Sequence, residues 1–117
     1  MIVKALAEAV CGMNYNIICD SALHKENREV LLDIPRRHGY EIIEINLEAG
    51  YEVLVERFNE RVEKANATPN AKISNTSIDR FKELYDIYQT NKNPNAVVFN
   101  TDKQSIEEVV GEIFKLI

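Results

Sequence analysis

The sequence has little of what membrane, secreted and nucleic-acid-binding proteins rely on. No apolar run approaches the ~20 residues of a membrane span, and Lys4 and Glu8 interrupt the apolar start in a way that a signal peptide does not. Basic residues are outnumbered, because 14 lysines and arginines stand against 19 acidic residues and give a net charge of -5. These shortages argue against a membrane protein and against general binding to nucleic-acid phosphates, which takes a basic patch.

Cysteine is also scarce. Cys11 and Cys19 lie in apolar segments, form no CxxC pair and have no metal-ligand spacing to His24 or His38. We therefore expect both thiols to be buried and reduced, and the protein to be cytoplasmic. Neither histidine has a nucleophile or carboxylate at a telling spacing, so we expect two ordinary polar residues.

What remains is the composition of an ordinary globular protein. The chain has 117 residues, of which 45% are hydrophobic and 28% are charged. That length suits one small domain over residues 1–117 rather than two, and it is enough to bury a modest core.

Hydrophobic periodicity divides the chain into alternating helices and strands. Short apolar or β-branched runs predict three strands, at 16–20, 40–47 and 96–100. Apolar residues at helical spacing predict five helices, at 2–13, 27–37, 51–64, 77–88 and 106–117. Such alternation implies right-handed crossovers, so the predicted fold class is α/β, with three α/β/α layers around a short, mostly parallel sheet.

Asp20 is the first candidate for chemistry, because it ends the apolar run at 16–20. Ligands of open α/β sheets bind outside the carboxyl ends of the strands, and a carboxylate there can support Mg²⁺ or accept a proton. The alternative is that Asp20 only caps the turn that follows.

Arg57 and Arg61 are the second candidates. They lie four residues apart on the predicted helix at 51–64, so they share one side of it, although like charges at this spacing repel by a few tenths of a kcal/mol. Guanidinium groups bind phosphate oxygens in a fork geometry, so the pair suits a shared anion. The alternative is that both arginines pair with the glutamates of the same helix.

Arg28 is the third candidate. It lies near the start of the predicted helix at 27–37, where a cation opposes the helix dipole and gains no local stability. It is expected to contact a substrate or Asp20, or else to be an ordinary solvated side chain.

The order of these segments resembles the small AAA-type P-loop kinases, a group that includes zeta toxins, gluconate kinase and the kinase domain of polynucleotide kinase. NIICDS at 16–21, Arg28 and GYEIIEINL at 39–47 are similar to the middle of these kinases. VLVERFNER at 53–61 looks like their lid helix, and 73–88 like the segment that returns from the lid. Residues 96–102 look like the last strand, so the resemblance covers nearly the whole chain, with a lid region at about 51–90.

The resemblance implies an ATP-dependent phosphotransferase that uses Mg²⁺. It implies that Asp20 is a catalytic residue that supports the metal ion. It also implies that Arg57 and Arg61 are catalytic residues, which neutralise the phosphoryl group during transfer.

The same resemblance assigns positions to the two substrates. Arg28 would lie near the acceptor, which is a small-molecule or nucleoside-type hydroxyl. Thr101 and Asp102 would lie near the base of the nucleotide.

One part of the family pattern is missing from this chain. Such kinases have a strand, a G-x-x-x-x-G-K-[ST] loop whose backbone amides cradle the phosphates, and then a helix. None of the four glycines here precedes Lys-Ser or Lys-Thr, and no two have the spacing of the loop. Phosphoryl transfer depends mostly on positioning and electrostatics, so we expect this chain to be inactive by itself.

The missing strand would also leave a gap in the sheet. In the family it lies at the centre, between the strands that match 16–20 and 41–47. We expect these two segments to pair directly, or the chain to self-associate or take the strand from a partner chain, because an open apolar edge is prone to association.

Two classes of function follow from these observations. In the first, the chain is the C-terminal part of an ATP-dependent kinase whose phosphate loop is encoded upstream of Met1 or supplied by a partner chain. In the second, it is a non-catalytic remnant or interaction module with a P-loop-kinase-like fold.

Overall fold

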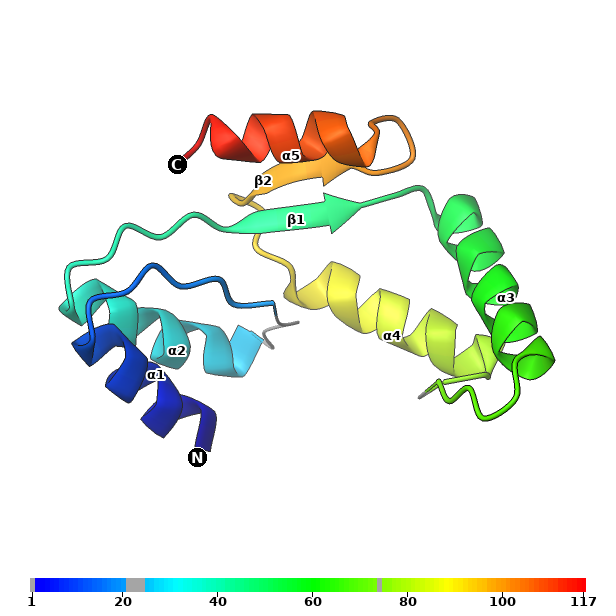
Figure 1. Cartoon of the computed structure of the whole chain (residues 1–117), viewed down its shortest axis with the longest axis horizontal. Helices are drawn as coiled ribbons and strands as arrows, with labels where there is room; N and C mark the ends of the chain where they lie inside the picture. Colours follow the sequence, from blue (N-terminus) through cyan, green and yellow to red (C-terminus); the bar gives the residue numbers. More distant parts are fainter. Residues whose placement is uncertain (1, 21–24, 74) are drawn as a thin grey trace.

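The computed structural model describes residues 2–20, 25–73 and 75–117, and its elements follow the predicted order except that no strand is formed at 16–20 (Figure 1). The helices are α1 (Ile2–Gly12), α2 (Lys25–Arg37), α3 (Tyr51–Ala67), α4 (Ile78–Asn91) and α5 (Ile106–Phe114). The strands are β1 (Ile45–Glu48) and β2 (Val97–Asn100). The five predicted helices are confirmed, and none in the described ranges is long and apolar enough to cross a membrane. His24, expected to be an ordinary polar residue, lies outside the described residues.

Local side-chain chemistry explains where several helices begin and end. Ser77 accepts a hydrogen bond from the backbone N–H of Arg80 at 3.3 Å, which caps α4. Ser105 accepts one from the N–H of Glu108 at 3.1 Å, which caps α5 as its capping-box sequence predicts. Gly39 follows α2 with a φ of 79°, the left-handed conformation that favours glycine at the end of a helix.

The sheet consists of two parallel strands. Ile45 pairs with Val97, and the register runs without a break to Glu48 and Asn100. The mixed helix–strand character and the parallel pairing are therefore confirmed. β1 is shorter than the predicted strand at 40–47, because backbone hydrogen bonds to a neighbouring strand are formed only where β2 runs alongside.

The prediction of a strand at 16–20 is wrong, and so is its direct pairing with 41–47. Ile18 is 98% exposed. Cys19 is also exposed, so its predicted burial is wrong, whereas Cys11 is buried; both are free thiols. An extended segment becomes a strand only when a neighbour takes up its backbone N–H and C=O groups. No described strand lies beside this segment, so it stays extended and unpaired.

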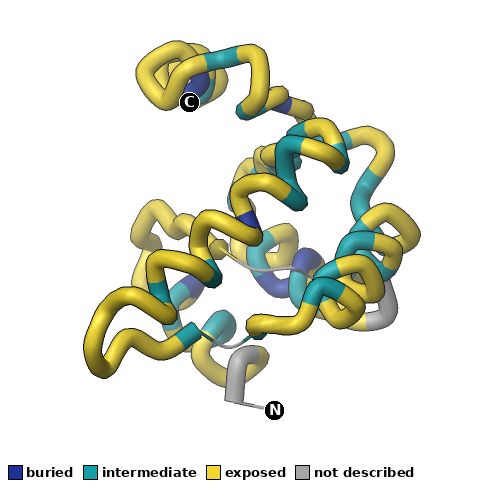
Figure 2. Tube along the Cα trace, turned by 90° about the vertical axis from the view of Figure 1, so that its right-hand side faces the viewer, coloured by how far each residue is buried: buried dark blue, intermediate teal, exposed yellow. Residues whose placement is uncertain are grey.

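The buried hydrophobic residues are divided among three places instead of one. They are Cys11, Leu32 and Ile34 in α1 and α2, Phe58 in α3, and Phe99 and Val109 in β2 and α5. Exposed residues accordingly follow most of the trace (Figure 2). The radius of gyration is 16.8 Å, compared with about 13 Å for a compact domain of this length. The molecule is open, with the α3–α4 arm on one side and the α1–α2 pair on the other (Figure 1).

Candidate functional site

The candidate site lies at the carboxyl ends of β1 and β2. Because the strands are parallel, both strands end at the same edge of the sheet, which we call the carboxyl edge. This is the position where α/β proteins bind ligands. The backbone carbonyl of Glu48, the last residue of β1, accepts hydrogen bonds from the N–H of Thr101 at 2.7 Å and from its hydroxyl at 3.1 Å. These two bonds fix Thr101 directly beyond the end of β2.

Arg57 reaches this edge from α3. Its Nη1 donates to the hydroxyl oxygen of Thr101 at 2.8 Å, and its Nη2 donates to the carbonyl oxygen of the same residue at 2.9 Å. The guanidinium therefore binds one residue with two parallel donors, the geometry in which it also binds carboxylate or phosphate. Two of the residues selected from the sequence, 44 positions apart, are in direct contact.

Asp102 joins the same edge from the other side. Its Oδ2 accepts the backbone N–H of Gly50 at 2.9 Å, directly before the first residue of α3. A carboxylate at a helix N-terminus satisfies a free N–H and is stabilised by the helix dipole. A Cβ atom at Gly50 would stand 3.3 Å from that oxygen, so a larger residue there would crowd the contact. In this arrangement Asp102 caps α3 and holds it against the end of β2.

Arg61 lies one turn beyond Arg57 and is exposed. Its guanidinium carbon is 5.9 Å from the ring centre of Phe58, a cation–π contact. Among the described residues neither Arg57 nor Arg61 forms an ion pair, so the expected alternative of pairing with the glutamates of α3 is not what this structure contains. The charge of each guanidinium is therefore available to an anion.

Asp20 is not joined to this site. It is exposed in the unpaired segment and forms no hydrogen bond or ion pair with another described residue. The described part of the chain also contains no group of three or more His, Cys, Asp or Glu side chains that could hold a metal ion. Mg²⁺ at nucleotide sites is usually bound by one or two carboxylates together with the phosphates. By this pattern Asp20 would hold Mg²⁺ only together with phosphate oxygens.

Arg28 occupies a different environment from the ones expected. Its side chain is only 16% exposed, its Nε lies 3.4 Å from Glu44 Oε1, and its Nη2 donates to the carbonyl oxygen of Asn91 at 3.1 Å. The side chain is thus neither freely solvated nor paired with Asp20. It ties the start of α2 to Glu44, directly before β1, and to the end of α4, and its charge is balanced by that carboxylate.

Arg28 belongs to a polar network that the sequence patterns did not predict. Asn46 donates to the carbonyl oxygen of Asn93 at 3.2 Å, and the Asn93 side chain donates to Glu44 at 2.5 Å. Lys92 forms an ion pair of 3.0 Å with Glu48. The detectable signal was the alternation of Glu44, Asn46 and Glu48, because residues at a spacing of two share one face of a strand.

This network changes the titration of a neighbouring tyrosine. Burial raises the pKa of Tyr88 above its usual range, and the negative charge of Glu48 adds to the effect while Lys92 opposes it. An ordinary tyrosine is already neutral at physiological pH, so the raised pKa leaves Tyr88 uncharged there.

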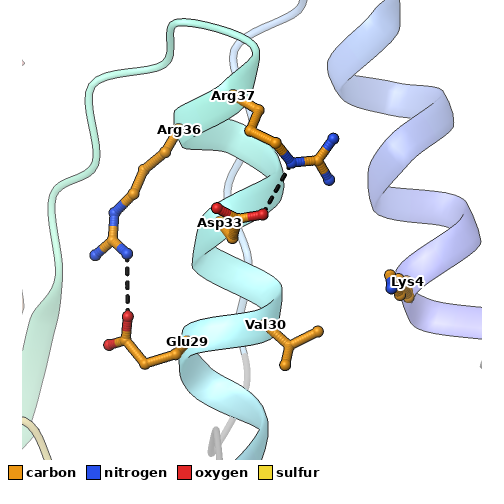
Figure 3. A pocket seen from close by; sticks show the side chains of 6 residues that line it. All are labelled: Lys4, Glu29, Val30, Asp33, Arg36 and Arg37. Atoms are coloured by element: carbon orange, nitrogen blue, oxygen red, sulfur yellow. Dashed lines mark hydrogen bonds and ion pairs between the residues drawn. The ribbon is translucent and has the colours of Figure 1, made fainter.

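Two hollows of the surface are lined by residues other than Arg57, Arg61, Thr101 and Asp102. One of about 430 Å³ is lined by six residues of α1 and α2, namely Lys4, Glu29, Val30, Asp33, Arg36 and Arg37 (Figure 3). Its two arginines are already bonded to Glu29 and Asp33, at 3.1 and 2.8 Å. Another, of about 340 Å³, lies beside Arg28, Lys92 and Pro94. In both hollows the arginines already face carboxylates, and so does Lys92 in the second. Unlike α3, neither hollow therefore offers an anion a guanidinium group that has no carboxylate partner.

Comparison with models of protein families, with curated proteins and with solved structures finds no match to this chain.

Proposed function

We propose that this chain is the nucleotide-side, C-terminal part of a P-loop-kinase-like phosphotransferase, and that its carboxyl edge binds the phosphates of ATP through Arg57 and Arg61. The observation that carries the proposal is the contact of Arg57 with Thr101 at the carboxyl ends of two parallel strands. The resemblance assigns Arg57 to the phosphates and Thr101 to the base of the nucleotide, and this contact brings the two residues together.

The chemistry of the edge suits a polyphosphate. Arg57 donates to two neutral oxygens of Thr101, which a phosphate oxygen can replace with a stronger, charge-assisted acceptor. Arg61 is exposed one turn away and adds a second positive charge. Thr101 and Asp102, which follow β2, would then face the nucleoside end.

The assignments of the other residues follow the family pattern. Asp20 would support Mg²⁺ only together with the phosphates of the bound nucleotide, and the ion would supply further charge neutralisation there. Arg28 would lie towards the acceptor hydroxyl of a small molecule or nucleoside. The complete domain would have the three α/β/α layers of the family, with the phosphate loop and its strand inserted beside β1.

Catalysis by this chain alone is not part of the proposal. The sequence contains no phosphate-cradling glycine loop, and without one the phosphoryl group is not held for transfer. We expect phosphate binding without phosphoryl transfer until such a loop is supplied.

The alternative function is a non-catalytic interaction module with the same fold. It is favoured by the number of apolar side chains that remain exposed, among them Ile18 at 98% and Leu47 at 59%. Exposed apolar surface on this scale commonly marks a site of protein association.

Isothermal titration calorimetry with Mg-ATP and with tripolyphosphate tests the proposal. We expect both ligands to bind, since both carry the phosphate chain. Arg57→Ala and Arg61→Ala should each weaken binding about tenfold or more, because a hydrogen bond to a charged group contributes about 1.5–3 kcal/mol.

Arg80→Ala is the matched control. Arg80 is an exposed arginine of the neighbouring helix α4 that pairs with Glu83 at 2.9 Å, so its loss changes net charge equally without touching the edge. If all three substitutions weaken ligand binding equally, the effect comes from the change in net charge and not from the edge. No binding of either ligand by the unaltered chain would reject the proposed phosphate site.

A further inference from the structure

The chain exposes far more surface than a folded monomer of its size. Its accessible surface is 9179 Å², whereas a compact monomer of 13.4 kDa exposes about 6,500 Å². The difference, roughly 2,700 Å², is as large as one partner's share of an extensive obligate interface, which buries about 1,000–2,500 Å² on each side. The amount of surface therefore points to a partner that covers a large part of the chain.

One uncovered feature is the outer edge of β1. The carbonyls of Glu44 and Glu48 accept the N–H groups of Val97 and Thr101, at 3.0 and 2.7 Å. In a parallel ladder alternate residues face the neighbouring strand, so the backbone groups of the intervening Leu47 face away from β2. The described sheet contains no strand on that side. The outer edge of β1 is thus free to pair with another strand.

A second uncovered feature is complementary to this edge. Residues 15–20 are extended and unpaired, and they include Ile17 at 42% and Ile18 at 98% exposure. The segment is anchored where it begins, because the hydroxyl of Tyr40 donates to the carbonyl oxygen of Tyr15 at 2.6 Å. Figure 1 draws β2 on one side of β1 and this segment on the other. The same chain therefore presents an open strand edge and an apolar segment that lacks a strand partner.

We propose that two copies of this chain form a symmetric dimer in which residues 15–20 of each copy pair with the outer edge of β1 in the other. In a two-fold dimer, if the segment of the first copy contacts the β1 edge of the second, the segment of the second must contact the β1 edge of the first. The segment and the edge can make both contacts. Each two-stranded sheet gains a third strand, which a small sheet needs for stability. The exchange also covers Ile17 and Ile18. The pairing leaves Arg57 and Thr101 at the carboxyl ends of the strands untouched, but a phosphate-loop strand inserted beside β1 would occupy the same edge and exclude the dimer.

Size-exclusion chromatography with light scattering tests the oligomeric state directly. We expect the unaltered chain to have twice the mass of its 13.4 kDa monomer. Ile18→Lys should halve that mass, because a charge would replace an apolar side chain on a face of the enlarged sheet. Circular dichroism should stay unchanged, since the side chain is 98% exposed in the single chain. Ile117→Lys, at a position 87% exposed at the end of the chain, should remain a dimer.

A disulfide experiment identifies the exchanged segment. Cys19 is exposed, and a second cysteine introduced as Leu47→Cys lies on β1. Residues opposite one another on paired strands lie about 4.5–5.5 Å apart, which suits a disulfide. Oxidation should link Cys19 to position 47 of the other copy, as peptide mapping after non-reducing electrophoresis would show.

Three results would overturn the dimer. The first is a monomeric mass for the unaltered chain at every concentration. The second is a dimer that survives Ile18→Lys. The third is a disulfide from Cys19 to position 47 within a single copy, which would mean that the segment closes on its own strand.

Discussion

The sheet side of the molecule and the α1–α2 pair are held together in different ways. At the sheet, backbone pairing of β1 with β2 is reinforced by long-range hydrogen bonds that Arg57 and Asn93 donate and that Asp102 accepts. In the α1–α2 pair, Cys11, Leu32 and Ile34 are buried and the polar links lie on the surface.

Few polar contacts join the two regions. Among the described residues they include the ion pair of Arg28 with Glu44 and the hydrogen bond from Arg28 to the carbonyl oxygen of Asn91. Local stability in a protein follows the density of buried contacts and protected hydrogen bonds. The two regions should therefore open separately, and substitutions in one should leave the other largely intact.

The largest expected effect comes from truncating the buried aromatic residue of α3. Phe58 is 3% exposed and packs against Phe81 with ring centroids 4.8 Å apart. Phe58→Ala should cost about 3–5 kcal/mol, because it removes a buried ring and leaves a cavity. Hydrogen exchange measured by mass spectrometry should show lost protection in α3 and α4 and little change in α1 and α2.

Ile34→Ala is the matched substitution in the other region. Ile34 has no exposed surface, so its truncation should cost about 2–5 kcal/mol, with the loss of protection confined to α1 and α2. If either substitution removes protection from both regions equally, the molecule is one cooperative unit and the comparison fails.

The next effect sharpens the boundary between the regions. Arg28→Met removes the guanidinium that faces Glu44, whose side chain is 27% exposed, and it leaves that carboxylate without its cation. We expect a loss of about 1–3 kcal/mol, since the partly buried Glu44 would lose its charged partner and keep only the hydrogen bond from Asn93. Thermal unfolding should also become broader or split, because the link from α2 to β1 and α4 would be gone.

A surface ion pair provides the control for Arg28. Arg80 and Glu83 lie three residues apart on α4 with side chains 51% and 60% exposed. Arg80→Met should cost no more than about 0.5 kcal/mol. Equal losses for Arg28→Met and Arg80→Met would show that the buried link between the regions has no special weight.

The same contrast explains what sequence reasoning could predict. The five helices were predictable because their caps and apolar spacing are local, as at Ser105 and Glu108. The contact between Arg57 and Thr101 was not predicted, because the resemblance assigned Arg57 to the phosphoryl group and Thr101 to the base of the nucleotide. The strand at 16–20 could not be judged locally, because pairing depends on a neighbour that its own residues do not specify.

Arg28 illustrates the same limit at the level of one side chain. Its position at the start of a helix gives it no local partner, and the carboxylate that balances it lies 16 residues further along the chain, on the segment leading into β1. Only the alternation of Glu44, Asn46 and Glu48 hinted that one face of β1 is polar. A buried polar network is specified by tertiary contacts, so it becomes visible only once the strands and helices are placed.

The smallest expected effect is the dependence of the α1–α2 pair on pH. Hydrogen bonds from Arg37 and His38 lower the pKa of the Glu8 carboxyl from its ordinary value of 4.5. A carboxyl whose pKa is lower in the folded state stabilises that state above its unfolded pKa. The contribution is therefore complete at neutral pH and disappears as the pH falls below 4.5 and through the folded value.

A double-mutant cycle isolates this contribution from other acid effects. Glu8→Gln should lower the melting temperature slightly at pH 7, and the difference from the unaltered chain should vanish in strong acid. In a chain that carries Arg37→Met, the main partner of Glu8 is absent, so Glu8→Gln should have a much smaller effect at either pH. A Glu8→Gln effect of the same size with and without Arg37 would mean that the carboxylate does not hold α1 to α2. The contrast between a surface-linked helix pair and a backbone-paired sheet would then rest on the buried residues alone.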